Sequence, residues 1–213
     1  MLKSLFLFSD SGLPPRSILV TSAVPGEGKS FVSTNLAVSI AQNINEYVLL
    51  VDCDLRRPTI HKYFEIGEVE GLSDYLAGDV PLFSLLNKTT IDKLTILPGG
   101  RPVKNPAELL SSRKMSQLLH ELKSRYSDRY IVIDSPPPKL TSETNVIARQ
   151  VDGIILIVKY RSTPKKLVAE LTAMLGKEKM LGVVINMCDF KSASHSYNKY
   201  GKYTDYYKSY VNE

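Results

Sequence analysis

Short runs of consecutive apolar, often β-branched residues recur along the chain, each bounded by polar or turn-forming residues. Apolar runs that do not alternate with polar residues are typical of central strands in a parallel sheet, because both faces of such strands are buried. Five of these runs predict buried strands, at residues 17–22, 47–51, 130–133, 153–158 and 181–185. A further strand is predicted at 93–97, before the turn Pro-Gly-Gly.

Helical spacing separates several of these runs. Apolar side chains recur every four residues within 30–43, and a clean amphipathic stripe runs from Met115 to Leu122, where we expect it to pack on the core. Further helices are expected to begin with proline at Pro106 and over 164–175, with a short helical piece at 72–76. Strands that alternate with helices in this way predict an α/β fold, a doubly wound, mostly parallel sheet with helices on both faces.

A glycine-rich turn, Ala-Val-Pro-Gly-Glu-Gly-Lys-Ser at 23–30, lies between the first predicted strand and the first long predicted helix. Such a turn, ending in Lys-Ser between a strand and a helix, is typical of a phosphate-binding loop, the P-loop of nucleotide-binding proteins. Its glycines let backbone N–H groups surround an anion, and the start of the helix adds a positive dipole end. Lys29 is then predicted to reach the β- and γ-phosphates, and the Ser30 hydroxyl to hold Mg²⁺.

The usual loop pattern begins with Gly where this chain has Ala23, so the assignment depends on the strand and helix that flank the loop. The alternative is an ordinary strand-to-helix turn whose lysine faces solvent. We expect ATP to contact the loop and the start of the helix, at Val24, Pro25, Gly26, Glu27, Gly28, Lys29, Ser30 and Phe31.

Acidic residues follow two of the predicted strands. Asp52 and Asp54 come after one, and Asp134 after another. Ligands of doubly wound sheets bind outside the carboxyl ends of the strands, so these acids are candidates for chemistry. Asp54 could instead cap a helix that begins at Pro58, and Asp134 could be a turn residue before Ser-Pro. Cys53 is expected to be a small buried residue.

Composition narrows the function classes only modestly. The chain has 213 residues, a formal net charge of +5 and two cysteines. Its length suits one α/β domain, and the cysteine count argues against a disulfide framework or a zinc or iron–sulfur site. Lys and Arg are spread along the sequence, so we expect a mixed, solvated surface and no nucleic-acid partner. No apolar run is long enough to span a membrane.

The last segment differs from the rest in composition. Residues 191–213 contain almost no aliphatic side chain, so they cannot bury enough apolar area to fold alone, and we expect a flexible tail. We therefore divide the chain into a P-loop domain at 1–190 and a tyrosine-rich tail at 191–213. Flexible tails usually lack aromatic residues, so we expect these tyrosines to be phosphoacceptors. Half of the chain's tyrosines lie here: Tyr197, Tyr200, Tyr203, Tyr206, Tyr207 and Tyr210.

Four features together resemble the bacterial protein-tyrosine kinases, or BY-kinases, of capsule and exopolysaccharide biosynthesis. They are the loop at 23–30, the run Asp52-x-Asp54-x-Arg56, the sequence Ile-Asp-Ser-Pro around Asp134, and the tyrosine cluster. The resemblance implies an ATP-dependent kinase that phosphorylates its own tail tyrosines, largely between subunits.

The resemblance also assigns roles to individual residues. It implies that Asp52 and Asp134 help Ser30 to hold Mg²⁺, and that Asp52 or Asp54 aids deprotonation of the tyrosine hydroxyl. Asn186, at the end of the last predicted strand, matches the position that contacts adenine in related ATPases.

The resemblance further implies partners. These are a membrane polysaccharide co-polymerase that activates the kinase, a phosphotyrosine phosphatase, and other copies of the chain. The expected location is cytoplasmic, at the inner face of the plasma membrane through a partner or a removed membrane segment. Relatives form rings through an N-terminal Glu-x-x-Arg-x-x-Arg helix. Residues 1–16 read as a remnant of this helix, at 1–8, and the loop after it, with Lys3 at the last Arg position. Lysine cannot reproduce a bidentate Arg–carboxylate pair, which argues against a ring.

Two other functions compete with the kinase. One is a P-loop switch ATPase of the partition or septum-positioning type, but those carry a signature lysine where this chain has Val24, and they lack a tyrosine tail. The other is a module that binds nucleotide without catalysis, which the complete set of Lys29, Ser30 and three acids argues against.

Overall fold

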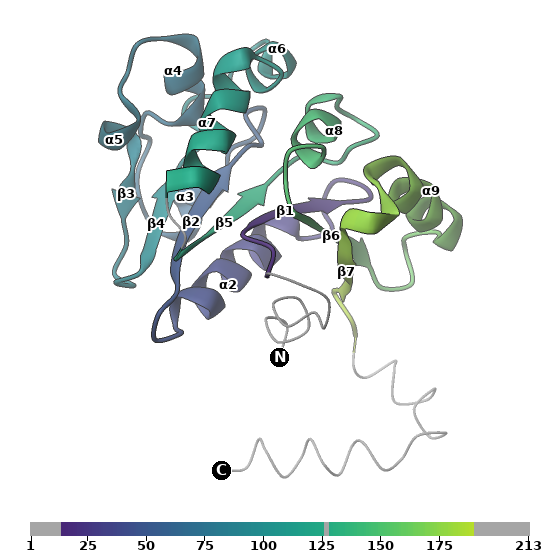
Figure 1. The fold of residues 1–213 in the computed structure, drawn as a ribbon. Helices are drawn as coiled ribbons and strands as arrows, with labels where there is room; N and C mark the ends of the chain where they lie inside the picture. Colours follow the sequence, from purple (N-terminus) through teal and green to yellow (C-terminus); the bar gives the residue numbers. More distant parts are fainter. Residues whose placement is uncertain (1–13, 126–127, 190–213) are drawn as a thin grey trace.

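The computed structural model describes residues 14–125 and 128–189 (Figure 1). The predicted N-terminal helix remnant at 1–8 and the predicted phosphoacceptor tyrosines lie outside these residues.

Within the described residues, seven strands form one sheet in the order β3-β4-β2-β5-β1-β6-β7. Neighbouring strands run parallel except for the short β3, which pairs antiparallel with β4. The predicted doubly wound, mostly parallel sheet is therefore confirmed. The strands are β1 (Ser17–Ser22), β2 (Tyr47–Asp52), β3 (Asn87–Lys88), β4 (Leu94–Leu97), β5 (Arg129–Asp134), β6 (Gly153–Lys159) and β7 (Met180–Asn186).

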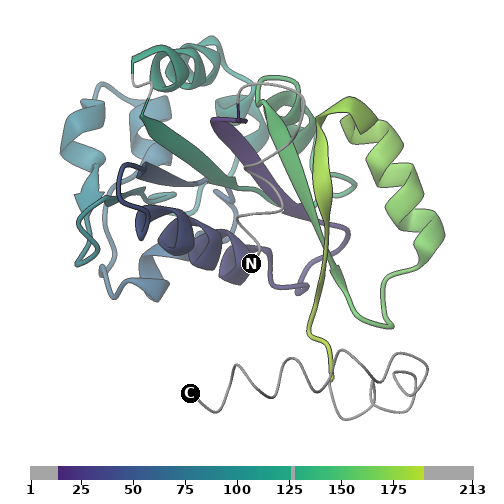
Figure 2. The ribbon, with the colours of Figure 1, turned by 60° about the horizontal axis from the view of Figure 1, so that its bottom comes forward.

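Helices cover both faces of this sheet (Figures 1 and 2). One face packs against α2 and α3, and the other against α4, α6, α7, α8 and α9. The helices are α2 (Lys29–Ala41), α3 (Ile60–Tyr63), α4 (Leu72–Ala77), α5 (Leu82–Leu85), α6 (Pro106–Leu110), α7 (Arg113–Arg125), α8 (Glu143–Ala148) and α9 (Lys165–Leu175), followed by the 3₁₀ turn η1 (Lys177–Lys179).

Most of the apolar runs form strands whose two faces are buried by the flanking helices. The run at 181–185 was also predicted to be a buried strand, but β7 is the last strand of the sheet among the described residues, and its Val183 and Ile185 side chains are exposed. Leu19 faces the layer of α7 and Val20 the layer of α2, and both side chains are fully buried. Each such side chain contributes about 1.5–3 kcal/mol relative to an exposed position. Burial makes the centre of the sheet a rigid base for the loops at its edge.

Four elements were not predicted: α5, β3, α8 and η1. Each spans six residues or fewer, which is too short for helical or strand periodicity to stand out. The helix expected to begin at Pro58 begins two residues later, at Ile60, with Thr59 in the capping position.

The sheet register collects one set of loops at one edge. Asp52 at the end of β2 lies opposite Asp134 at the end of β5, and β5 pairs with β1, which leads into the glycine-rich loop. The central strand order β2-β5-β1 thus brings both acids beside that loop. In the part of the chain that the structure describes, no helix is long and apolar enough to cross a membrane.

Candidate functional site

The glycine-rich loop turns sharply from β1 into α2. Gly26 and Gly28 have φ angles of +80° and +84°, a left-handed conformation that side-chain-bearing residues rarely adopt. Gly28 also caps α2, and a Cβ atom there would lie 2.3 Å from Asn186 Nδ2. The loop therefore requires glycine at 28 for both conformation and space. The first N–H groups of α2 have no acceptor within the helix and are free to bind an anion.

Four predicted side chains converge beside this loop. Lys29 Nζ lies 2.9 Å from Asp54 Oδ2, 3.8 Å from Asp134 Oδ2 and 3.2 Å from Ser30 Oγ. The Ser30 hydroxyl donates a 2.6 Å hydrogen bond to Asp134 Oδ2. Residues from β1–α2, β2 and β5 thus form one polar cluster where the sequence predicted phosphate and Mg²⁺ binding.

The cluster is largely buried, and its charges shift each other's proton affinity. Burial raises the pKa of Asp134, and this effect exceeds the opposing effects of Lys29 and Ser30. Burial also raises the pKa of Asp52, and the neighbouring Asp134 raises it further. Burial lowers the pKa of Lys29, but the nearby carboxylates more than offset this, so its pKa is raised. The lysine therefore stays charged. The two buried carboxylates, by contrast, have too little positive charge nearby to compensate their own negative charge.

One orphaned oxygen fits a cation. Asp134 Oδ1 is buried and has no hydrogen-bond partner, although an unsatisfied buried carboxylate oxygen is costly. The described residues hold no group of three or more His, Cys, Asp or Glu side chains that could bind a metal ion. Mg²⁺ commonly takes one or two carboxylates and completes its shell with water and phosphate oxygens. Ser30 and Asp134 fit that mode of binding.

Asp52 has a different environment from Asp134. Its Oδ2 accepts hydrogen bonds from the N–H groups of Thr59 and Ile60, at 2.9 and 3.0 Å, and its Oδ1 accepts one from Asp54 N–H at 3.1 Å. Asp52 thus binds the first turn of α3, and three backbone amides occupy its oxygens. The sequence left open that Asp54 caps this helix. In the structure, the carboxylate that accepts the N–H groups at the start of α3 belongs to Asp52. Asp54 accepts only the turn N–H of Arg57, at 3.2 Å, and keeps Oδ2 for Lys29.

Glu27 and Val24, both predicted to contact nucleotide, also contact each other. The Glu27 side chain is only 1% exposed and points into the protein, so a nucleotide contact of Glu27 would be made by its backbone. Its Oε2 accepts the Val24 N–H at 2.8 Å, and its Oε1 accepts the Lys159 N–H at 3.1 Å and the Thr163 hydroxyl. The carboxylate therefore joins the phosphate loop to the β6–α9 connection, and the Val24 N–H is not available to an anion.

Removing this carboxylate should destabilise the fold. Glu27→Ala removes the acceptor of the buried Val24 N–H and one of the two partners of the Lys159 N–H and of the Thr163 hydroxyl, so we expect the free energy of unfolding to fall by about 1–3 kcal/mol. Glu27→Gln retains one acceptor oxygen and should lose less, and Glu108→Ala, at an exposed position, should stay within about 0.5 kcal/mol. Urea titration of the three variants measures this. Equal stability of Glu27→Ala and Glu108→Ala would contradict the role of the Glu27 carboxylate in joining the phosphate loop to the β6–α9 connection.

Other predicted contacts surround the loop. Val24 and Phe31 have exposed side chains, at 41% and 53%, and are open to a ligand. Asn186, expected at adenine, donates from Nδ2 to the Glu27 carbonyl at 2.8 Å and so supports the loop from β7. Cys53 is fully buried, as predicted.

The sequence analysis missed one further connection, between Arg56 and Glu143. The guanidinium lies 3.3 Å from Glu143 Oε1, and the glutamate is 1% exposed at the first turn of α8. This pair ties the loop after β2 to the helix that follows the Asp134 loop. No pattern marked Glu143, because α8 itself was not predicted.

Comparisons with known proteins agree with this geometry. The family model that matches residues 15–209 is described as ParA: NUBPL iron-transfer P-loop NTPase. The putative tyrosine-protein kinase CapB of Staphylococcus aureus is 32% identical over 203 residues, which cover 94% of this chain and 88% of CapB. The tyrosine-protein kinase YwqD of Bacillus subtilis is 35% identical, with coverage of 88% and 77%.

A solved structure extends the similarity to three dimensions. The crystal structure of the chimerical protein CapA2B2 superposes with a TM-score of 0.77 at 31% identity, covering 88% of this chain and 81% of the chimera. Other curated relatives named tyrosine-protein kinases are longer, and this chain covers 22% to 26% of their length.

Proposed function

Because the chain belongs to the bacterial tyrosine-protein kinases, we propose that it transfers the γ-phosphoryl group of ATP to tyrosines of its own C-terminal segment, largely from one copy to another. The protein is a protein-tyrosine kinase on a P-loop NTPase fold, in a family of capsule and exopolysaccharide synthesis. The observation that best supports phosphoryl transfer at this site is that Lys29, Ser30, Asp54 and Asp134 converge at one edge of the sheet.

In the proposed reaction, the residues of the cluster divide the work. Lys29 and the loop N–H groups bind the phosphates. Ser30 and Asp134 would hold Mg²⁺, which would supply positive charge to the phosphates. The phenol oxygen forms a bond to the γ-phosphorus as the bond to the β-phosphate oxygen breaks, releasing ADP. Asp54 takes the phenol proton, because its Oδ2 faces the cluster, whereas backbone amides occupy the oxygens of Asp52.

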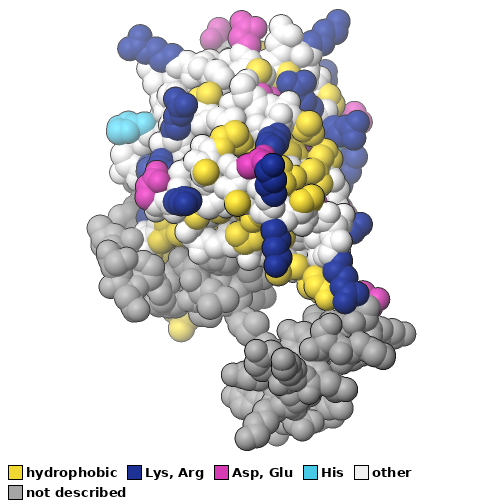
Figure 3. Space-filling view, turned by 90° about the vertical axis from the view of Figure 1, so that its right-hand side faces the viewer, with side chains coloured by type: hydrophobic (Ala, Val, Ile, Leu, Met, Phe, Trp, Pro, Cys, Tyr) yellow, Lys and Arg dark blue, Asp and Glu magenta, His cyan; other side chains and the backbone are white. Residues whose placement is uncertain are grey.

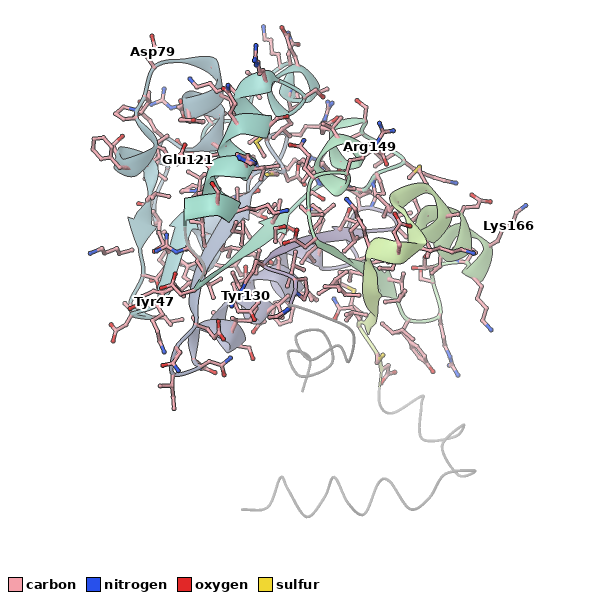
Figure 4. The ribbon with its side chains drawn as sticks, in the orientation of Figure 1. Tyr47, Asp79, Glu121, Tyr130, Arg149 and Lys166 are labelled. Carbon is pink, nitrogen blue, oxygen red and sulfur yellow. The ribbon has the colours of Figure 1, made fainter. Side chains whose placement is uncertain are left out.

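Two tyrosines of the sheet, Tyr47 and Tyr130, are poor acceptors by position. Tyr130 is 3% exposed, and burial raises its pKa. Tyr47 and Tyr130 lie at the amino ends of β2 and β5, the edge away from the phosphate loop (Figure 4). By contrast, the chain leaves β7 at Asn186, which contacts the loop directly. The C-terminal segment therefore begins at the edge of the sheet that carries the phosphate loop.

The proposed setting follows from the family. We propose that a membrane polysaccharide co-polymerase activates the kinase at the inner face of the plasma membrane, and that a phosphotyrosine phosphatase resets the tail. The second candidate function, a switch ATPase, is favoured only by the ParA-type family model, and Val24 stands at the position of its signature lysine.

Incubation of the full chain with ATP and Mg²⁺, followed by mass mapping, tests the proposal. We expect phosphate on tail tyrosines, and none when all six are replaced by Phe, while ATP binding is unchanged within about twofold. Undiminished phosphotyrosine in the six-Phe variant, or phosphate release from ATP without any phosphotyrosine, would overturn it.

A mixing experiment tests transfer between copies. A six-Phe chain supplies an intact site without acceptors, and a Lys29→Met chain supplies acceptors without the catalytic lysine. We expect phosphotyrosine on the Lys29→Met chain only in the mixture. If neither the separate chains nor the mixture is labelled while the wild type is, transfer within one copy is the mode.

A further inference from the structure

The charge of the folded domain is concentrated at one end. Residues 14–158 contain sixteen Lys or Arg and sixteen Asp or Glu and are therefore neutral, whereas residues 159–187 contain six Lys or Arg and two Glu, a net charge of +4. This second segment, which we call the basic end, comprises the end of β6, α9, η1 and β7. One of its two acids, Glu170, is paired with Lys139 at 2.6 Å. The excess of Lys and Arg over acids within residues 14–187 therefore falls in this segment.

The same end exposes aliphatic side chains. Val183 and Ile185 alternate along β7 and are 43% and 58% exposed. Met187, after the strand, has its side chain beside Gly28 of the phosphate loop instead. In the described residues β7 is the last strand of the sheet and pairs only with β6. Helix α9 buries its apolar residues against β6, so it does not cover these side chains. Figure 3 shows this end of the molecule, with Lys and Arg side chains around apolar ones, and Figure 4 shows Lys166 pointing away from α9 into solvent.

We propose that the basic end is the docking surface for the phosphorylated C-terminal segment of the same chain, residues 190–213. This inference rests on the proposed function, because it needs phosphate on the tail tyrosines. A phosphotyrosine combines an aromatic ring with a dianionic phosphate. The basic end offers the matching pair, aliphatic side chains for the ring and ammonium groups for the phosphate.

Charge makes the docking conditional on phosphorylation. Residues 191–213 contain four Lys and two acids, a net charge of +2, so the unmodified tail is repelled by the basic end. Each phosphate adds about −1.5 to −2, so six phosphates bring the tail to about −7 to −10. The modified tail is then repelled by the acidic cluster of Asp52, Asp54 and Asp134 and attracted to the cations beside β7.

The connection point favours docking within one chain. The segment begins three residues after Met187, at the end of the strand that carries the exposed aliphatic side chains. A tether this short gives a millimolar effective concentration, so weak contacts suffice. Docking would keep the product tail away from the phosphate loop and from phosphatases.

Installing the phosphates chemically separates this inference from the proposed function. Cys188 is a natural ligation junction, so a synthetic peptide of residues 188–213, with or without phosphotyrosines, can be joined to residues 1–187 to give the full chain. Hydrogen exchange of β7 and α9 then reports docking without any kinase activity. We expect amides in 165–187 to exchange about tenfold more slowly in the phosphorylated chain, with the difference lost in high salt.

Matched variants test the surface. The triple variant Lys165→Glu, Lys166→Glu and Lys177→Glu should abolish the protection, and Ile185→Ser should weaken it. The triple variant Lys88→Glu, Lys104→Glu and Arg113→Glu changes the same charge at exposed positions outside the basic end and should retain it. A tyrosine phosphatase should likewise act several-fold faster on the first triple variant than on the second.

The outcomes separate the alternatives. Identical exchange of the two ligated chains, or equal loss of protection in both triple variants, would overturn the inference. So would binding of the unphosphorylated chain to phosphatidylglycerol vesicles through 165–187 without any effect of tail phosphate, because the surface would then serve a membrane. Protection in the ligated chain together with no ATP-dependent phosphotyrosine would support the docking surface and refute the proposed function.

Discussion

Lys29→Met should reduce the rate of tail phosphorylation by about 10³-fold or more, the larger of the losses that we expect from a single substitution. The lysine side chain is 14% exposed and lies between two carboxylates, 2.9 Å from Asp54 and 3.8 Å from Asp134. No other Lys or Arg contacts these two acids in the described residues. Methionine keeps the length of the side chain but removes the charge that opposes the γ-phosphate, so binding of ATP should weaken less than turnover.

The measurement is incorporation of labelled phosphate under single-turnover conditions, with ATP affinity from a separate titration. Lys139→Met is the matched control, because Lys139 is exposed and only pairs with Glu170 on the surface. It should retain activity within about twofold. Activity of Lys29→Met within tenfold of the wild type would refute the assignment of the phosphate loop.

The sheet could be predicted because its strands are apolar on both faces. Five uninterrupted runs, together with the helical spacing between them, were enough to give the strand positions and the doubly wound topology. Neighbouring carboxyl ends then imply that the acids after β2 and β5 meet the loop after β1. That acids after β2 and β5 cluster with Lys29 and Ser30 follows from the topology, but which acid after β2 contacts Lys29 does not.

The contacts of Glu27, Asp52 and Asp54 could not be predicted, because they depend on the direction of each side chain. The sequence places Glu27 inside a phosphate loop, but only the fold shows that its carboxylate turns toward Lys159 and Thr163, more than 130 residues away. Similarly, Asp52 and Asp54 are equivalent in the sequence pattern. The start of α3 distinguishes them, because its free N–H groups take the oxygens of Asp52 and leave Asp54 for the lysine.

Asp134→Asn should have opposite effects on activity and on stability. We expect phosphoryl transfer to fall by about 10³-fold, because the substitution removes the carboxylate that contacts Ser30 and whose second oxygen is orphaned. In the absence of Mg²⁺, the same variant should be more stable than the wild type by about 1–3 kcal/mol at pH 8, because a buried charge beside Asp52 is gone. Asn can still accept the Ser30 hydroxyl, so the local packing is retained.

The effect of Asp134 on stability should depend on pH, and the pKa shifts give its direction. Burial, with like-charge repulsion from Asp134, raises the pKa of Asp52 from 3.8 to about 7, and burial raises the pKa of Asp134 to about 6. The folded metal-free protein therefore binds more protons than the unfolded chain between pH 4 and 7, so stability falls as pH rises through that window. In Asp134→Asn one of these groups is absent and the other loses its charged neighbour, so the fall should be much smaller. Thermal unfolding in a chelator from pH 5 to 8 measures it, with the exposed Asp79→Asn as control (Figure 4). Parallel stability curves for all three proteins would show that Asp134 is not a destabilising charge and would remove the argument that it awaits a cation.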